Sequence, residues 1–387
     1  MIELDIDRIA NGGDGIGSVD GKTVFVPGAV PGDRATIEIV EERRRFDRGR
    51  LVELVRPSSD RTAPLCRHTA VCGGCTWQQV DYQAQLEWKR EIVASQLRHL
   101  AGVEVDIGPT LAVGPPFHYR NRMDYAVHDG RLALHRRASH DLVALQECRL
   151  VVEPLAQVVS AAHGLEGLGG AGRRVTLRAG VTTGELMAVV DAPIEGLPIA
   201  QAHPSEAVIH EEVRGTRLRI SGRAFFQANT AGAERLVDLV SAALGPVDGR
   251  SLVDLYAGVG LFAATLGGGA ERVSAFEIDR RAVSDLEANV PTVEVVLGSI
   301  EKTLGSWSEP GVDLVVADPP RDGMGPAVVE EIVRLGPEAI ASVSCDSATF
   351  ARDTRSLIDH GYRLEWVQPV DLFPHTPHVE IVARLCR

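Results

Sequence analysis

One cysteine of this chain stands where a reactive thiol could lie. Cys345 follows an apolar run in the stretch AIASVSCDSATFARD, so a strand would deliver its side chain into a polar turn. A thiolate is a nucleophile, but a free cysteine usually serves only as a small buried hydrophobe. Which of the two applies depends on the groups that the fold brings to the same strand end.

A glycine-rich turn follows another apolar strand in LVDLYAGVGLFAATLG. Gly258 and Gly260 allow a tight turn from strand to helix and a close approach of a ligand to the backbone. Glu277 ends the next predicted strand about 20 residues later, where a carboxylate can accept hydrogen bonds from both hydroxyls of a ribose. This pattern predicts an adenosine-type ligand and leaves NAD and S-adenosylmethionine open.

The acid at the end of a further strand favours S-adenosylmethionine. In VVADPPRDGM, Asp318 precedes two prolines, which have a fixed φ and no N–H group. The result is a rigid ledge that carries a carboxylate and could hold a planar base or amide against a cofactor. The plainer alternative is a proline-stiffened loop with a capping aspartate. Acid-Pro-Pro here resembles amino-methyltransferases, to which this chain adds Cys345 one strand later.

Four other cysteines have the spacing of a metal site. Cys66, Cys72 and Cys75 lie in CRHTAVCGGCTWQQ, and Cys148 follows far downstream in QECRL. Four thiolates suit either a tetrahedral zinc ion or a [4Fe–4S] cluster. Zinc sites more often use two CxxC pairs, whereas only one is present, so we expect the cluster, with zinc as the alternative. Cys386 has no partner in the sequence.

The elements that must position these residues form three predicted regions in an α/β protein. Short alternating stretches over 1–57 predict a small antiparallel barrel. A β-rich central domain is expected over 66–222, with a long amphipathic helix at about 81–100 that is a candidate to pack on the catalytic domain. From 223 to 387, apolar strands alternate with helices, which predicts a doubly wound sheet with ligands at the carboxyl ends of its strands.

Charge and hydropathy exclude some function classes. A net charge of −13 argues against a protein that coats nucleic acid indiscriminately, because such binding depends on Lys and Arg. Two basic segments, 43–50 and 120–137, are candidate phosphate contacts for local RNA binding. No apolar run is long enough to cross a bilayer and no export signal is visible, so we expect a cytoplasmic monomer without membrane contact.

Six strings occur in a fixed order along the chain: GRAFFQANT, DLYAGVGLF, FEID, DPPRDGM, SVSCDSATFARD and FPHTPHVE. Together they resemble the RNA 5-methyluridine methyltransferase family over essentially the whole chain. The resemblance implies a Rossmann-like class I methyltransferase domain and transfer of a methyl group from S-adenosylmethionine to uridine C5. It implies Cys345 as the nucleophile and Glu380 as the base. The residues implied for the donor and the adjoining uracil are Gln227, Tyr256, Gly258, Gly260, Glu277 and Asp318.

The branch of the family is indicated by the remaining strings. CGGCxWQ resembles the iron–sulfur branch, which implies Cys66, Cys72, Cys75 and Cys148 as ligands, and GDGIG and VPGAVPGD resemble the OB-like TRAM module. These features favour ribosomal RNA (23S) over transfer RNA as substrate. One departure concerns the nucleophile: Asp346-Ser347 follows it instead of Asn-Pro, and a carboxylate there would raise the pKa of the thiol. A NAD-dependent oxidoreductase and a noncatalytic RNA-binding protein remain the alternatives.

Overall fold

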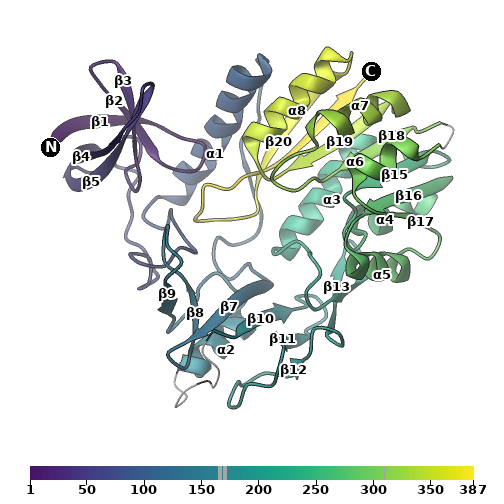
Figure 1. Cartoon of the computed structure of the whole chain (residues 1–387), viewed down its shortest axis with the longest axis horizontal. Helices are drawn as coiled ribbons and strands as arrows, with labels where there is room; N and C mark the ends of the chain where they lie inside the picture. Colours follow the sequence, from purple (N-terminus) through teal and green to yellow (C-terminus); the bar gives the residue numbers. More distant parts are fainter. Residues whose placement is uncertain (164–167, 169–171, 309–310) are drawn as a thin grey trace.

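The N-terminal region of the computed structural model is a closed five-stranded barrel in the order β1-β2-β3-β5-β4 (Figure 1). The model describes residues 1–163, 168, 172–308 and 311–387. The strands are β1 (Ile2–Ile9), β2 (Gly15–Val19), β3 (Lys22–Val26), β4 (Arg34–Glu42) and β5 (Phe46–Arg56). Alternate side chains fill the barrel, as the sequence pattern predicts. One pair differs from the antiparallel expectation: β3 and β5 are parallel, because the β4–β5 hairpin folds β5 back beside β3.

The predicted helix after the cysteine cluster is present as α1 (Tyr82–Gln96), continued by a π-helical turn over Leu97–Ala101. It packs against a helix and a strand of the C-terminal region, α8 (Ser347–Asp359) and β20 (Arg363–Asp371). Its buried face contains two polar residues, Gln85 and Lys89, beside the apolar ones. These two side chains have partners in the C-terminal region, residues 223–387, which the resemblance above predicts to be catalytic and which we call the catalytic region.

The catalytic region is built on an eight-stranded sheet, which confirms the doubly wound α/β prediction. Its order is β17-β16-β15-β18-β19-β21-β20-β6. The strands not yet given are β6 (Leu111–Ala112), β15 (Ser251–Leu255), β16 (Arg272–Glu277), β17 (Glu294–Leu297), β18 (Leu314–Ala317), β19 (Ala339–Ser344) and β21 (Glu380–Cys386). Strands β15 to β19 are parallel, whereas β21 runs antiparallel to both of its neighbours. The first residue of β21 therefore lies at the same edge as the last residues of β18 and β19.

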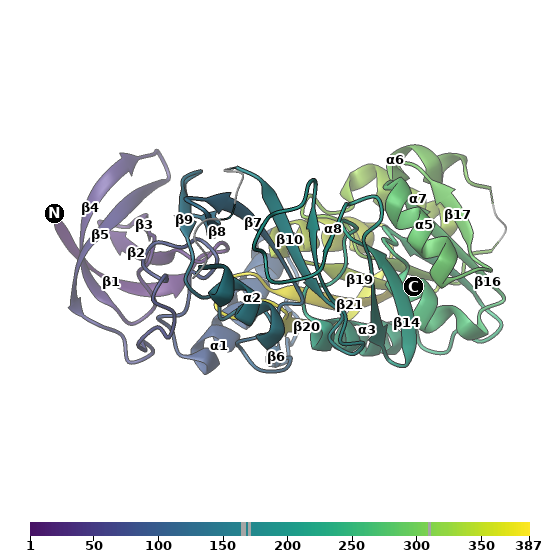
Figure 2. The same ribbon diagram turned by 90° about the horizontal axis from the view of Figure 1, so that it is seen from below.

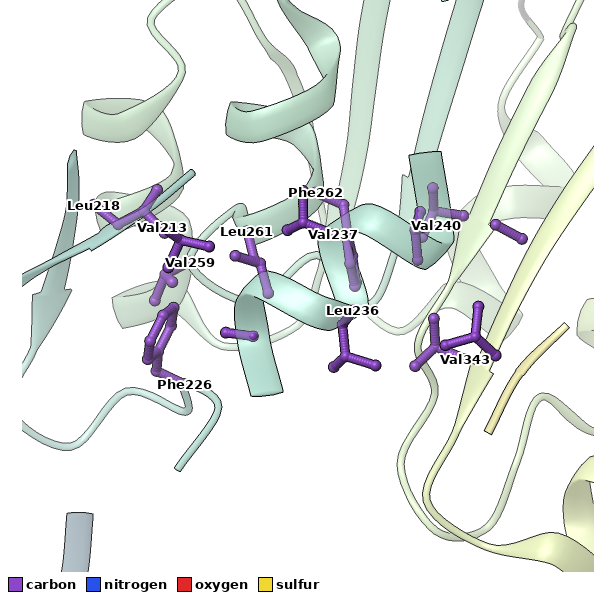
Figure 3. Close-up of a cluster of buried hydrophobic side chains, with 14 of the residues drawn as sticks. Val213, Leu218, Phe226, Leu236, Val237, Val240, Val259, Leu261, Phe262 and Val343 are labelled. Carbon is purple, nitrogen blue, oxygen red and sulfur yellow. The ribbon is translucent and has the colours of Figure 1, made fainter. Parts of the chain in front are cut away.

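Helices cover both faces of this sheet because its central strands are apolar on both sides. Besides α8 they are α3 (Thr230–Leu244), α4 (Leu261–Leu266), α5 (Arg280–Asn289), α6 (Ile300–Thr303) and α7 (Gly325–Leu335). Short 3-10 turns follow α4 and α6, at Gly267–Gly269 and Leu304–Ser306. Helices α3 and α4 share one core with the sheet, while α7 and α8 share another. Phe226 packs into the first core with Val259 and Leu261 (Figure 3). This contact anchors the chain just before Gln227.

Residues 66–222 contribute to more than one sheet. A six-stranded sheet in the order β12-β11-β10-β7-β8-β9 forms the centre, covered by α2 (Glu153–His163). Its strands are β7 (Arg122–His128), β8 (Arg131–His135), β9 (Leu142–Ala144), β10 (Arg174–Ala179), β11 (Leu186–Val190) and β12 (Gln201–Ala202). The hairpin of β13 (Val208–Val213) and β14 (Thr216–Ser221) instead bonds to α5, where Asp285 accepts from the Ser221 N–H at 2.6 Å.

The barrel and strands β15 to β17 lie at opposite ends of the molecule, with the central sheet between them (Figures 1 and 2). The loop between β20 and β21 extends from the catalytic sheet toward the barrel (Figure 1). Within the described part of the chain, no helix combines the length and the apolar character that crossing a bilayer requires.

Candidate active site

One pocket at the carboxyl edge of the catalytic sheet collects most of the residues singled out in the sequence. It is lined by Gln227, Tyr256, Gly258, Glu277, Asp318, Cys345 and Glu380. The strand-end rule explains Glu277, Asp318 and Cys345, and the antiparallel direction of β21 adds Glu380. Gly260 does not line the pocket. It begins α4 at φ +89°, and a Cβ there would lie 2.5 Å from Leu286.

The Glu277 end of the pocket has the geometry of a ribose site. Its carboxylate accepts the Gly258 N–H at 2.8 Å, and the Ile278 and Asp279 N–H groups at 2.7 Å each. These bonds fix the carboxylate between the glycine turn and the end of β16. Ile278 lines the same pocket with 66% of its side chain exposed, which offers an apolar surface to a flat ring.

Cys345, Asp318 and Glu380 gather at the other end of the pocket. Burial raises the pKa of both carboxyl groups, and the charge of Asp318 raises that of Glu380 further. Burial also raises the pKa of the Cys345 thiol to about 11, with further contributions from Glu380 and Asp318, while Arg321 lowers it. In the free protein the thiol is therefore protonated at neutral pH.

This environment predicts the pH dependence of Cys345 alkylation. The rate of reaction with iodoacetamide should rise about tenfold per pH unit from 7 to 9, since only the thiolate reacts. Asp318→Asn removes a charge that raises the pKa and should speed the reaction at pH 8. Mass spectrometry of the Cys345 peptide measures both rates. A plateau below pH 8 in the wild-type protein would contradict the prediction.

Asp346 has a different role from the one expected. Its Oδ1 accepts the Ala348 N–H at 3.0 Å and the Thr349 N–H at 2.9 Å, so it caps the N-terminus of α8. The carboxylates that raise the pKa of the Cys345 thiol are those of Glu380 and Asp318. Asp346 thus serves as a helix cap, a role that asparagine at this position could also fill.

Comparison with known proteins agrees with this geometry. The chain is 31% identical to an uncharacterized RNA methyltransferase of Thermotoga maritima, over 100% of this chain and 99% of that protein. The chain belongs to the RNA methyltransferases. An uncharacterized RNA methyltransferase of Thermosynechococcus vestitus is 32% identical over 99% of this chain and 97% of its own length. This membership replaces the oxidoreductase alternative.

Two further comparisons give matches: one is to a domain model at the N-terminus, and the other is to a solved structure over nearly the whole RNA methyltransferase chain. Residues 1–52 match the TRAM domain, in agreement with the closed barrel. The crystal structure of the Pyrococcus abyssi tRNA (uracil-54, C5)-methyltransferase, in complex with S-adenosyl-L-homocysteine, is similar with a TM-score of 0.75. Its sequence is 28% identical, and the likeness covers 99% of this chain and 100% of that one.

The sequence analysis missed several residues that line this pocket of the RNA methyltransferase, among them Phe225, Arg321 and His378. Phe225 is 67% exposed although its neighbour Phe226 is buried, so it projects into the pocket. Arg321 directly follows the Asp-Pro-Pro ledge, which could have drawn attention to it. Conversely, the predicted basic segment 120–137 is only partly a surface, because the Arg122 guanidinium donates to the Ala224 carbonyl at 2.9 Å.

Helix α1 holds the loop between β20 and β21. Lys89 Nζ donates to Asp371 Oδ1 at 2.5 Å and to the Phe373 carbonyl at 3.1 Å, and both charged side chains are fully buried. Gln85 Oε1 accepts the His375 N–H at 2.9 Å, where the backbone has a φ of +65°. Gln85 thus holds the backbone of His375 in this loop, which leads directly into Glu380.

Breaking the buried Lys89–Asp371 pair should make the RNA methyltransferase less stable to unfolding. Lys89→Met leaves the Asp371 carboxylate buried without its cation, which we expect to lower the free energy of unfolding by about 3–5 kcal/mol. Urea denaturation measures this loss. Lys302→Met, at an exposed lysine, is the matched control and should change stability by less than about 0.5 kcal/mol. Equal stability of the two variants would contradict a structural role of Lys89.

The four clustered cysteines of the RNA methyltransferase face a separate pocket, the cluster pocket, away from the candidate active site. Cys66, Cys72, Cys75 and Cys148 all line it, together with apolar side chains such as Leu134 and Leu150. Across the described residues, no three His, Cys, Asp or Glu side chains are grouped so as to hold a single metal ion. Thr76 and Trp77 directly follow Cys75 in the sequence. They donate their N–H groups to the His375 carbonyl at 3.0 Å each. The cysteine segment is therefore tied to the catalytic loop.

Proposed function

We propose that this RNA methyltransferase transfers a methyl group from S-adenosylmethionine to C5 of a uridine in RNA. The observation that carries the proposal is the convergence of Cys345, Asp318 and Glu380 in the pocket that also contains Glu277. The likeness to a tRNA (uracil-54, C5)-methyltransferase over the whole chain supports it.

The residues at the Glu277 end fit the methyl donor. Glu277 would accept hydrogen bonds from the ribose hydroxyls, the Gly258 turn would allow close approach, and Ile278 would pack on the adenine ring. Tyr256 and Gln227 line the same pocket, and Gln227 Nε2 donates to Asp318 Oδ2 at 3.4 Å. When bound, the donor supplies an electrophilic methyl group.

Uridine C5 is a poor nucleophile, and the role proposed for Cys345 is to activate it. The Cys345 thiolate adds to C6 of the uracil, which forms an S–C6 bond and places the electron pair of the C5=C6 bond in an enolate. That electron pair would then form a bond from C5 to the methyl carbon as the bond between this carbon and the sulfonium sulfur of the donor breaks, which leaves a neutral thioether. Glu380 removes the C5 proton, and the electron pair left at C5 re-forms the double bond as the S–C6 bond breaks. The thiolate is regenerated, so Cys345 divides one difficult step into two.

The raised pKa values of the two buried carboxyl groups, Glu380 and Asp318, have two opposing effects on the reaction. A raised pKa makes Glu380 a base able to take a carbon-bound proton, because proton transfer is more favourable to a stronger base. It also opposes ionisation of the nearby thiol. Binding of a cationic donor beside Asp318 would lower the pKa of Cys345, since an opposite charge offsets the carboxylates.

We also propose that Cys66, Cys72, Cys75 and Cys148 hold a [4Fe–4S] cluster. All four thiols face one pocket, and only one CxxC pair is present, whereas zinc sites more often use two. The residues after Cys75 bond to the catalytic loop, so the cluster would stabilise that loop without taking part in methyl transfer.

Metal analysis of anaerobically purified protein tests the cluster. We expect about four iron atoms and about four acid-labile sulfides per chain, as this cluster requires. Cys148→Ser should lose most of the iron, whereas Cys386→Ser, a change at a buried cysteine outside the cluster pocket, should keep it. One zinc per chain without iron would show that the alternative is correct.

The substrate RNA is proposed to be ribosomal, with transfer RNA as the second candidate. The TRAM barrel and the proposed cluster favour ribosomal RNA, whereas the Pyrococcus abyssi likeness favours transfer RNA. Incubation with S-adenosylmethionine and 5-fluorouridine-substituted transcripts of each class distinguishes them. Fluorine cannot leave C5 as a proton does, so the substrate stays attached to the protein. The absence of an adduct with both classes would contradict the proposed function.

A further inference from the structure

A second pocket adjoins the first at the reactive cysteine. It is lined by residues of the catalytic region and by the barrel residues Asn11 and Gly12. The residues from the catalytic region are Arg321, Cys345, Asp346, Ser347, Pro377, His378 and Val379. Arg321, Cys345 and His378 line both pockets. A chain that places one unit against Cys345 in the first pocket can therefore continue past Arg321 into the second.

The barrel contributes its β1–β2 turn to this pocket through a close contact. A Cβ on Gly13 would lie 2.8 Å from Pro377, and the residue has a φ of +92°, so only glycine fits. Trp77 Nε1 donates to the Gly13 carbonyl at 3.4 Å, which ties the turn to the cysteine segment as well. Asn11 is exposed at the tip of this turn, on the lining of the pocket.

The catalytic side of the pocket contains a polar group without a partner. Ser347 is 2% exposed, and its Oγ makes no hydrogen bond in the described part of the chain. A buried hydroxyl without a partner costs free energy, so such a group indicates a missing ligand. Ser347 is the first residue of α8, where the Asp346 carboxylate already accepts the Ala348 and Thr349 N–H groups. The positive charge that could meet a phosphate in this pocket is that of the exposed Arg321 side chain.

We propose that this second pocket binds the nucleotide next to the target uridine, with its phosphate at Ser347 and Arg321 and its base beside Asn11. The inference rests on the proposed function, because it places the target uridine at Cys345. A phosphate at the first turn of α8 would accept the Ser347 hydroxyl and face the Arg321 cation. The Asn11 amide offers both donors and an acceptor, so it can distinguish bases by their hydrogen-bonding edges.

Ser347→Ala tests the phosphate contact. The probe is the fluorescently labelled transcript that forms the 5-fluorouridine adduct with wild-type protein, and anisotropy measures its binding. We expect the Kd to rise about tenfold, because a hydrogen bond to a charged group is lost. The midpoint of urea denaturation should stay the same or rise, since the variant removes an unpartnered buried hydroxyl. The rate of adduct formation at saturating RNA should be unchanged.

Asn11→Ala tests base recognition by the barrel. Transcripts carrying each of the four bases on either side of the target uridine are compared by the KM for methyl transfer. Wild-type protein should prefer one base at one flanking position by about tenfold, and Asn11→Ala should lose that preference with little change in kcat. Ser18→Ala, at an exposed residue of β2 outside the pocket, is the matched control and should behave as wild type.

The outcomes distinguish a failure of the proposed nucleotide pocket from a failure of the proposed function. If wild-type protein forms the adduct but neither Ser347→Ala nor Asn11→Ala alters binding or base preference, the second pocket is not a nucleotide site and the proposed function stands. If wild-type protein forms no adduct with either RNA class, both the function and this inference are overturned. A loss of adduct formation at saturating RNA in Ser347→Ala would place Ser347 in the chemistry and also contradict the inference.

Discussion

Replacing Cys345 with alanine should abolish the covalent adduct with 5-fluorouridine RNA and slow methyl transfer by roughly 10⁴-fold or more. Without the thiolate, no group in the pocket can add to C6 and make C5 nucleophilic. The donor site that we propose lies around Glu277 and does not include Cys345, so donor affinity should be preserved. Filter binding of radiolabelled methyl groups to RNA measures the rate, and calorimetry measures donor affinity.

Cys386→Ala is the matched control for this variant. Cys386 is also buried and unpaired, but it lies at the far end of β21 from Glu380, where its Sγ contacts Glu365 Oε1 at 2.9 Å. It should form the adduct at the wild-type rate. Methyl transfer by Cys345→Ala within about tenfold of wild type would show that the mechanism does not use this thiol.

Glu380→Gln should separate the two halves of the reaction. Adduct formation and methyl transfer should proceed, because glutamine has the same shape and Glu380 raises the pKa of the thiol when charged. Removal of the C5 proton should slow by about 10²–10⁴-fold, the range of a general base. Protein and ordinary uridine RNA should therefore remain covalently joined, visible as a slowly migrating band on a denaturing gel.

Glu338, an exposed residue just before a strand of the same sheet, provides the control for Glu380→Gln. Glu338 precedes β19 at the amino-terminal edge, away from the pocket, so Glu338→Gln should turn over normally. If Glu380→Gln releases product at the wild-type rate, the base is another group. The first candidate would then be Asp318, whose pKa is also raised by burial.

Several parts of the molecule could be predicted from local sequence. The barrel over 1–57, the helix after the cysteine cluster and the doubly wound sheet all follow from the spacing of apolar residues, and each is present. The strand-end rule also predicts that Glu277, Asp318 and Cys345 share one edge, because parallel strands present their carboxyl ends together. Their position in one pocket could therefore be predicted without knowing which distant residues contact each other.

Other parts depend on contacts between residues far apart in the chain. The amphipathic pattern of α1 gave no reason to bury Lys89 and Gln85, whose partners Asp371 and His375 lie 282 and 290 residues away. Leu100, an apolar residue near the end of the predicted helix, lies in the π-helical turn and is exposed, which the apolar pattern did not indicate. Local periodicity reports which face is apolar, but not which polar groups find buried partners.

The sequence by itself determined the elements of this protein and the strand ends that carry its reactive groups, because both follow from the short-range geometry of the backbone. Only the tertiary structure decided how the site is completed. The antiparallel direction of β21 brings Glu380 beside Cys345, and α1 fixes the loop that leads to it. The contact of Gly13 with Pro377 brings a barrel turn to the same cysteine, since only packing determines which distant surfaces meet.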